Sequence, residues 1–154
     1  MKIHSAFSLL VSSLLLAGAL GCAGSRPDDL GLHDGKLRPC PTSPNCVSSA
    51  ASDEEHAIAG FAFSSGAEEA WKAASDAVRE LPRTEVISQT DDYLHAESTS
   101  ALMRYVDDVE LHLLAAEGTI AVRSASRLGH SDMGANRKRI EALRAILEGK
   151  GTLR

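Results

Sequence analysis

Charged side chains alternate with apolar ones along two neighbouring segments, DDVELHLLAA at residues 107–116 and TIAVRSASR at residues 119–127. A period of two is typical of a β-strand with one face on the core and one face outside it. Guanidinium groups suit the geometry of carboxylates and phosphates. The pattern therefore predicts a solvated charged ladder, a charged face buried under a loop or helix, or a site for an anion or polar ligand. The residues on the charged face are Asp108, Glu110, His112, Arg123 and Arg127.

Glu117-Gly118 between these segments is typical of a two-residue hairpin turn. We therefore predict that Ala116 pairs with Thr119. This register sets His112 opposite Arg123, Glu110 opposite Ala125 and Asp108 opposite Arg127. The other face of both strands is predicted to be core, with Val109, Leu111, Leu113, Ile120 and Val122 beside Ser124 and Ser126.

A helix is predicted after a short polar loop, with one stripe at helical spacing: Met133, Asn136, Ile140, Leu143 and Leu147. An amide on an apolar stripe is costly unless it is bonded, so Asn136 should bond the loop or a strand side chain. Ser131 or Asp132 is the expected N-cap. Arg137 opens a basic run that either is compensated by nearby carboxylates or serves an anionic partner.

These residues predict a non-enzymatic module that binds a small anionic ligand or an envelope partner through an Arg/Asp-rich face. One alternative is a hydrolase that uses Glu97, Asp108 or Glu110 with His112 as acid and base. Another is a structural or assembly factor whose charged face packs on a second envelope protein. No serine elbow or dense metal-ligand motif occurs, so we assign no catalytic residue, metal or cofactor. The ligand-binding candidates are Asp108, Glu110, Arg123, Arg127, Asp132, Asn136 and Arg137.

The first 21 residues are predicted to be a signal peptide, because a short positive start precedes an apolar run that ends in Ala19-Leu20-Gly21-Cys22. The end of this run resembles a bacterial lipobox, with Ala19 and Leu20 in exchanged positions. We therefore expect a lipid on Cys22 and a location in the cell envelope, facing the periplasm. Ala23 after the cysteine favours the outer membrane. The alternative is an ordinary secretory peptide that leaves Cys22 free.

Residues 22–38 are polar and carry no periodicity, so they are predicted to be a flexible tether with a reach of roughly 20–25 Å. Cys40 and Cys46 enclose two prolines, which in an exported protein favours a short-loop disulfide. The alternative is a metal site that also uses His33 or His56.

The chain between the cysteines and the charged strands adds a strand at 56–64, a helix opened by a capping box at Ser65, and strands at 84–89 and 93–99. The resulting order, β-α-β-β-β-β-α, predicts an α+β fold in which an antiparallel meander carries two helices on one face, in a helix-grip-like layer. Residues 39–149 are expected to form the single domain, followed by a short tail at 150–154.

Composition weighs against nucleic-acid binding. The chain has 16 Lys and Arg against 21 Asp and Glu, a formal net charge of −5, and six aromatic residues. No apolar run after the signal peptide is long enough to span a bilayer.

Four stretches in order resemble the bacterial and plastid family known as domain of unknown function 1499: CPTSPNCVSS (40–49), YLHAESTS (93–100), RYVDDVE (104–110) and RSASRLGHSDMGANRKRIEALR (123–144). The resemblance runs from about Leu37 to Leu147. Many family members look like lipoproteins or membrane-associated envelope proteins, which agrees with the export signal. The resemblance implies no activity and no catalytic residues.

Overall fold

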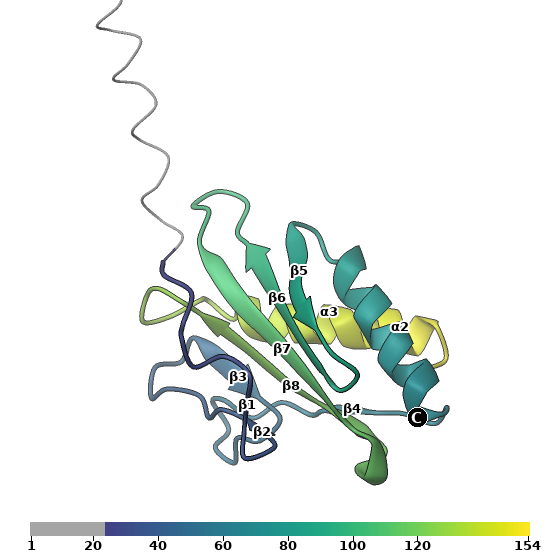
Figure 1. The fold of residues 1–154 in the computed structure, drawn as a ribbon. Coiled ribbons are helices and arrows are strands. Elements are labelled where there is room, and N and C mark those ends of the chain that lie inside the picture. Colours follow the sequence, from purple (N-terminus) through teal and green to yellow (C-terminus); the bar gives the residue numbers. More distant parts are fainter. Residues whose placement is uncertain (1–23) are drawn as a thin grey trace, which may run out of the picture.

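The computed structural model describes residues 24–154, in which one antiparallel sheet carries two helices on the same face (Figure 1). This is the predicted α+β arrangement, and the predicted order of elements holds from β4 onward. The strands are β1 (Leu32–His33), β2 (Lys36–Leu37), β3 (Cys46–Ser48), β4 (Phe61–Ala62), β5 (Thr84–Gln89), β6 (Tyr93–Thr99), β7 (Val106–Leu114) and β8 (Thr119–Ser126). The helices are α2 (Ala67–Glu80) and α3 (Ala135–Gly149), and a 3-10 turn, η1, spans Ala115–Glu117.

The large sheet has the order β3-β8-β7-β6-β5, and β4 also pairs with β8. Strand β8 is thus enclosed on both edges, by β7 along one and by β3 and β4 along the other. The small β1–β2 sheet is a separate hairpin. The most deeply enclosed strands, β7 and β8, are also the two that carry the charged face.

The hydrophobic core lies between the sheet and the two helices. Strand residues Val109, Leu111, Ile120 and Val122 have no exposed surface, as the period-two pattern predicts. The helices contribute apolar stripes at helical spacing: Ala70, Trp71, Ala74 and Val78 from α2, and Ile140, Leu143 and Leu147 from α3.

Helix boundaries differ from the prediction at both N-termini. The N-cap of α2 is Gly66, and Ser65 makes no capping bond, so the predicted capping box is wrong. The N-cap of α3 is Gly134, in a left-handed conformation that suits glycine. Met133 lies before the helix and is 91% exposed, so it does not belong to the buried stripe.

The register between β7 and β8 is shifted by two residues from the prediction. Leu114, not Ala116, pairs with Thr119, because η1 and Gly118 make a four-residue connection in place of a two-residue turn. Glu110 consequently lies opposite Arg123, and Asp108 lies opposite Ala125. A shift of two leaves every side chain on its predicted face, since strand side chains alternate with a period of two.

The segment expected to be a tether folds onto the sheet within its described residues, 24–38. Leu37 is buried, and the Gly31 amide donates to Glu110 Oε1 at 3.1 Å. Figure 1 shows the β1–β2 hairpin lying across the face of the sheet opposite the helices. The C-terminal residues also pack on the domain, where Leu153 bridges Phe63. The folded unit therefore extends beyond the expected 39–149 on both sides.

Across residues 24–154, no helix combines the length and the apolar character that crossing a membrane requires.

Candidate functional site

Arg127 is the centre of the charged face. Its Nε donates to Asp108 Oδ2 at 2.9 Å and its Nη2 to Asp108 Oδ1 at 2.7 Å, a two-point bond between a fork and a carboxylate. The same Nη2 also bonds Glu97, which faces Asp108 across β6 and β7. All three side chains are buried or half-buried, so this part of the face is not a solvated ladder.

The surroundings of Asp108 favour its charged form. Burial by itself would raise the pKa of this carboxyl, but hydrogen bonds from Arg127 and His95 outweigh burial and lower the pKa to about 2. His95 Nε2 lies 2.8 Å from Asp108 Oδ1. Asp108 is therefore a fixed negative charge at neutral pH and does not serve as a proton donor.

Arg123 and Glu110 form a second ion pair on this face. Arg123 Nη1 donates to Glu110 Oε2 at 2.8 Å, and the two side chains are 2% and 0% exposed. The Tyr93 hydroxyl donates to the other oxygen of Glu110 at 2.9 Å. Burial and the Glu110 charge raise the pKa of Tyr93, so the phenol stays protonated.

A hollow of about 440 Å³ lies between the two ion pairs and the N-terminal segment. The Nε atoms of Arg38 and Arg123 are buried and have no hydrogen-bond partner among the described residues. Burial lowers the pKa of Arg123, and the nearby charge of Arg38 lowers it further. The side chains of Arg38 and Arg123 thus both line one hollow, and each keeps one buried donor without a partner among the described residues. Its lining is Pro27, Asp29, Arg38, Pro39, Cys40, Pro41, Asp108, Arg123, Ala125, Ser126 and Arg127.

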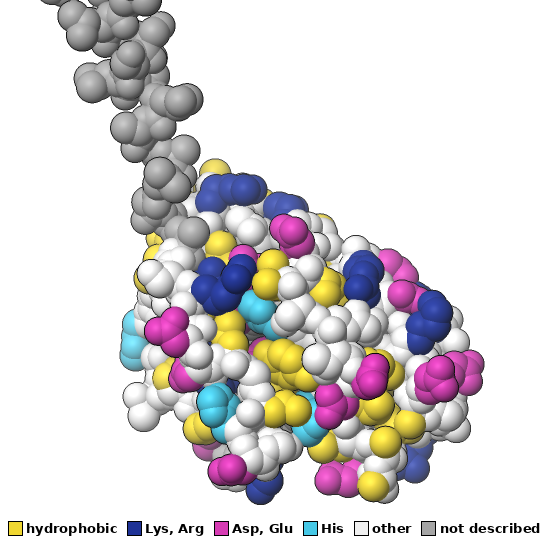
Figure 2. Space-filling view, in the orientation of Figure 1, with side chains coloured by type: hydrophobic (Ala, Val, Ile, Leu, Met, Phe, Trp, Pro, Cys, Tyr) yellow, Lys and Arg dark blue, Asp and Glu magenta, His cyan; other side chains and the backbone are white. Residues whose placement is uncertain are grey.

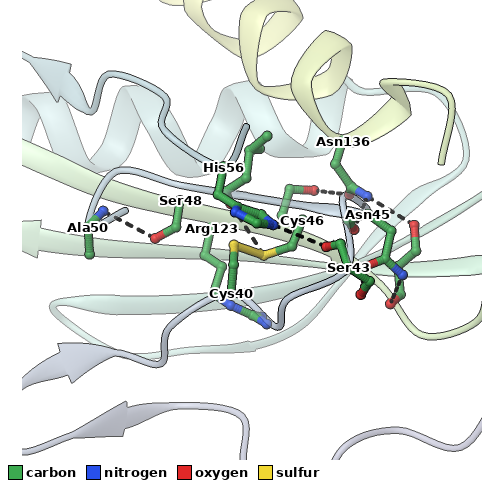
Figure 3. The surroundings of a disulfide bond; sticks show 12 residues. Cys40, Ser43, Asn45, Cys46, Ser48, Ala50, His56, Arg123 and Asn136 are labelled. Atoms are coloured by element: carbon green, nitrogen blue, oxygen red, sulfur yellow. Dashed lines mark hydrogen bonds between the residues drawn. A yellow bond between two sulfur atoms is a disulfide. The ribbon is translucent and has the colours of Figure 1, made fainter. Parts of the chain in front are cut away.

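Cys40 of the predicted disulfide is one of the residues that line this hollow. Cys40 and Cys46 are bonded, with their Cα atoms 5.7 Å apart. Figure 3 shows the His56 ring beside this bond. His56 Nε2 lies 3.1 Å from the Ser43 carbonyl oxygen and Nδ1 lies 2.6 Å from Asp53, and these two acceptors raise the pKa of His56. His56 therefore links the loop between the cysteines, through Ser43, to Asp53. Both of its ring nitrogens are used in these bonds, so neither is left to bind a metal.

Asn136 joins the helix to the sheet on the other face. Its buried amide donates to the Asn45 carbonyl at 3.0 Å and to Ser126 Oγ at 2.9 Å, and its oxygen accepts from Ser124 Oγ at 2.6 Å. The expectation of a specific partner for this amide is thus confirmed. Asp132 accepts from the Asn136 backbone at 2.7 Å and so supports the first turn of α3 without being its N-cap.

These positions separate the predicted binding residues into two groups. Asp108, Glu110, Arg123 and Arg127 lie together on the face under the N-terminal segment. Asp132 and Asn136 belong to the helix side, and Arg137 donates to the carbonyls of Ala57 and Glu55 at 2.8 and 3.0 Å. The predicted site is thus brought together only in part, because the sheet separates the two groups.

A model of the family described as "Protein of unknown function (DUF1499)" matches residues 36–147 of this chain. The chain belongs to the DUF1499 family. The comparisons with curated proteins and with solved structures find no match. The matched residues of the DUF1499 domain include Arg38 and both buried ion pairs, whereas residues 24–35 lie outside the match.

One cluster in this DUF1499 domain has the donor types of a metal site. Ligand atoms of His95, Glu97 and Asp108 lie within 4.8 Å of one another. Arg127 already bonds both carboxylates, so a metal ion would have to displace a buried guanidinium. The same bonds occupy Glu97 and Asp108, two of the three carboxylates of the hydrolase hypothesis, and the third, Glu110, is paired with Arg123. The Arg127 bonds also lower the pKa values of Asp108 and Glu97, whereas a general acid at neutral pH needs a raised pKa.

Several residues of this site were not predicted from the sequence. Tyr93 and His95 alternate with Glu97 along one strand, and this spacing could have placed them on the charged face. Arg38 and Asp29 carry no such signal, because they lie in the polar segment without periodicity. Their role depends on where that segment docks.

Proposed function

We propose that this chain is a lipid-anchored cell-envelope protein, attached through Cys22 and facing the periplasm, with the outer membrane favoured over the inner. Its domain is a non-enzymatic module that binds a small anion. The export signal at residues 1–21 and the lipobox-like Gly21-Cys22 support the location. The Cys40–Cys46 disulfide supports an oxidising compartment.

One observation carries the binding proposal: Arg38 and Arg123 face the same hollow, each with a buried Nε that has no partner in residues 24–154. A buried donor without an acceptor costs about 1–3 kcal/mol, and more when it is charged. A carboxylate or phosphate oxygen placed between the two guanidinium groups would accept from both and would relieve their repulsion.

The Asp29 carboxylate is the group that a ligand would replace. It pairs with Arg38 Nη1, but its side chain is 61% exposed. By contrast, the buried partner of Arg123, Glu110, is fixed by Tyr93 and Gly31. An incoming anion can therefore exchange with Asp29 while the buried pairs stay in place.

Inorganic phosphate is a suitable first probe, added at constant ionic strength with chloride as the reference anion. We expect phosphate to raise the melting temperature of the wild-type protein in a saturable way, because a ligand that binds only the folded state stabilises it. Arg38→Gln should abolish this rise. Asp29→Asn should shift saturation to lower phosphate concentrations by several-fold, since it removes the competing carboxylate.

Arg79→Gln is the matched control, because Arg79 lies on α2 and bonds Gln89, away from the hollow. It should respond to phosphate as the wild type does. An equal response in Arg38→Gln, or no response in any variant including Asp29→Asn, would count against the anion site.

A further inference from the structure

The large hydrophobic side chains exposed in residues 24–154 are confined to two connections, β6–β7 and β8–α3. Leu102 is 88% exposed and Met103 is 52% exposed, at the tip of the β6–β7 connection. An exposed apolar cluster on a small domain usually marks a contact with a partner or a membrane. The full set is Leu102, Met103, Tyr105, Leu128 and Met133.

These connections lie at the end of the domain where the described chain begins. Gly24 packs on Leu128, so closely that a Cβ atom at position 24 would lie 3.0 Å from Leu128 Cγ. The Arg127 amide in turn donates to the Val106 carbonyl at 3.3 Å, which places the β8–α3 connection beside the start of β7. In Figure 1 the β6–β7 connection and the start of the described chain lie at the same end of the sheet.

Because the described segment is folded onto the domain, no long spacer lies between Cys22 and the folded part of the chain. Gly24 is already held against the domain, and only Ala23 separates it from the cysteine. Two residues of extended chain span at most about 7 Å. A lipid on Cys22 would thus hold this end of the domain at the bilayer surface. The separation of roughly 20–25 Å that a flexible tether would allow is absent.

Basic side chains accompany the apolar cluster. Arg104 adjoins Met103 and is exposed, and the Arg83 Nε donates to the Thr99 carbonyl at the end of β6. Neither arginine pairs with a carboxylate within the part of the chain that the structure describes. Figure 2 shows basic groups beside apolar atoms at the upper end of the molecule. Apolar side chains flanked by arginines and a tyrosine fit the boundary between headgroups and acyl chains of an anionic bilayer.

We infer that the β6–β7 connection is a membrane-insertion loop, in which Leu102 and Met103 enter the bilayer next to the lipid anchor while Arg104 binds lipid phosphates. This inference rests on the proposed lipidation of Cys22. It fixes the orientation of the domain, with the η1 turn at the far end of β7 pointing away from the membrane.

The test uses the full lipidated protein in vesicles of phosphatidylcholine and phosphatidylglycerol with brominated acyl chains. An indole is introduced by Leu102→Trp, and a matched control carries Ala116→Trp in η1, at the opposite end of the nine-residue strand β7. Bromine quenches indole fluorescence only at short range. The wild-type chain, whose single Trp71 is buried between α2 and the sheet, supplies the background.

We expect bromolipids to reduce the emission of the Leu102→Trp variant at least twofold more than that of the Ala116→Trp variant. Equal quenching in protein that sediments with the vesicles would overturn the insertion loop and leave lipidation intact, which would assign the cluster to a protein partner. Protein that carries no lipid by mass spectrometry and does not sediment would overturn both proposals. Met103→Ser in the Leu102→Trp background should reduce the quenching, since it removes part of the inserted surface.

Discussion

The guanidinium group of Arg123 and the carboxylate of Glu110 face each other across β8 and β7 at 2.8 Å, and neither side chain is more than 2% exposed. A pair this deeply buried loses the hydration of both charges, so its members depend on each other. Of the three arrangements predicted for this face, solvated, buried under a loop or helix, or a binding site, the structure has the buried one, an interior layer between the sheet and residues 24–38. Its ion pairs hold the N-terminal segment in place, and the hollow beside them is what remains for a ligand.

Glu110→Gln should destabilise the protein by about 3–5 kcal/mol, because it leaves the Arg123 charge buried without a counter-charge. The measurement is urea unfolding at neutral pH. Asp76→Asn is the control, since it removes the same charge from the exposed Lys72–Asp76 pair and should cost at most about 1 kcal/mol. Similar losses in both variants would contradict the buried pair.

Asp108 should make stability sensitive to acid. Its pKa is about 2 in the folded state against 3.8 for an ordinary aspartate carboxyl, so the folded state binds fewer protons than the unfolded state in this range. The stabilisation, roughly 2 kcal/mol, is complete above about pH 5 and is lost as the pH falls toward 2. Asp108→Asn should be less stable at neutral pH and should lose less stability between pH 5 and pH 2.

The acid-linked loss is measured by chemical unfolding at a series of pH values. Asp91→Asn, a change at an exposed carboxylate, should follow the wild-type curve. If Asp108→Asn also follows that curve, the bonds from Arg127 and His95 do not hold Asp108 as described.

Asn136→Leu should destabilise the protein by about 3 kcal/mol or more. The substitution keeps an apolar helix stripe but removes the bonds of the amide to the Asn45 carbonyl, Ser124 and Ser126, and each lost bond costs about 1 kcal/mol. Thermal or urea unfolding gives the difference. Lys138→Ala, at an exposed position on the same turn, should change stability by less than about 0.5 kcal/mol. A neutral Asn136→Leu would mean that the amide is not a structural bridge.

Cys22 should carry a lipid at the mature N-terminus. Mass spectrometry of the purified protein checks this, and Cys22→Ser should release the protein from the membrane fraction. Cys40→Ser tests whether loss of any cysteine has the same effect, and that variant should stay in the membrane fraction. An unmodified N-terminus at another residue would contradict the anchor.

Local patterns predicted the helices and strands from α2 onward well, because each pattern depends on neighbouring residues, whereas the strand expected at 56–64 is reduced to Phe61–Ala62. The alternation in 107–127 assigned Val109, Leu111, Ile120 and Val122 to the core face. The assignment is correct although the predicted register was wrong by two residues, because a shift of two keeps each side chain on the same face. The error arose at Glu117-Gly118, where Ala115–Glu117 forms a 3-10 turn that a dipeptide signal does not reveal. Asn136 was recognised as a bonded amide because its position on an apolar stripe is itself a local signal.

The sequence by itself determined the α+β class and the two faces of the sheet, since both follow from local periodicity. The cysteine spacing favoured a disulfide over a metal site, and the structure decided for the disulfide. Only the tertiary structure decided that the charged face is interior, because the segment that covers it, residues 24–38, has no periodicity and docks through the Gly31 amide, Arg26 and Leu37. Such docking depends on partners 70 or more residues away in the chain, and no local pattern encodes that distance. The same docking placed Arg38 against Arg123 and brought Gly24 to the end of the sheet that exposes Leu102.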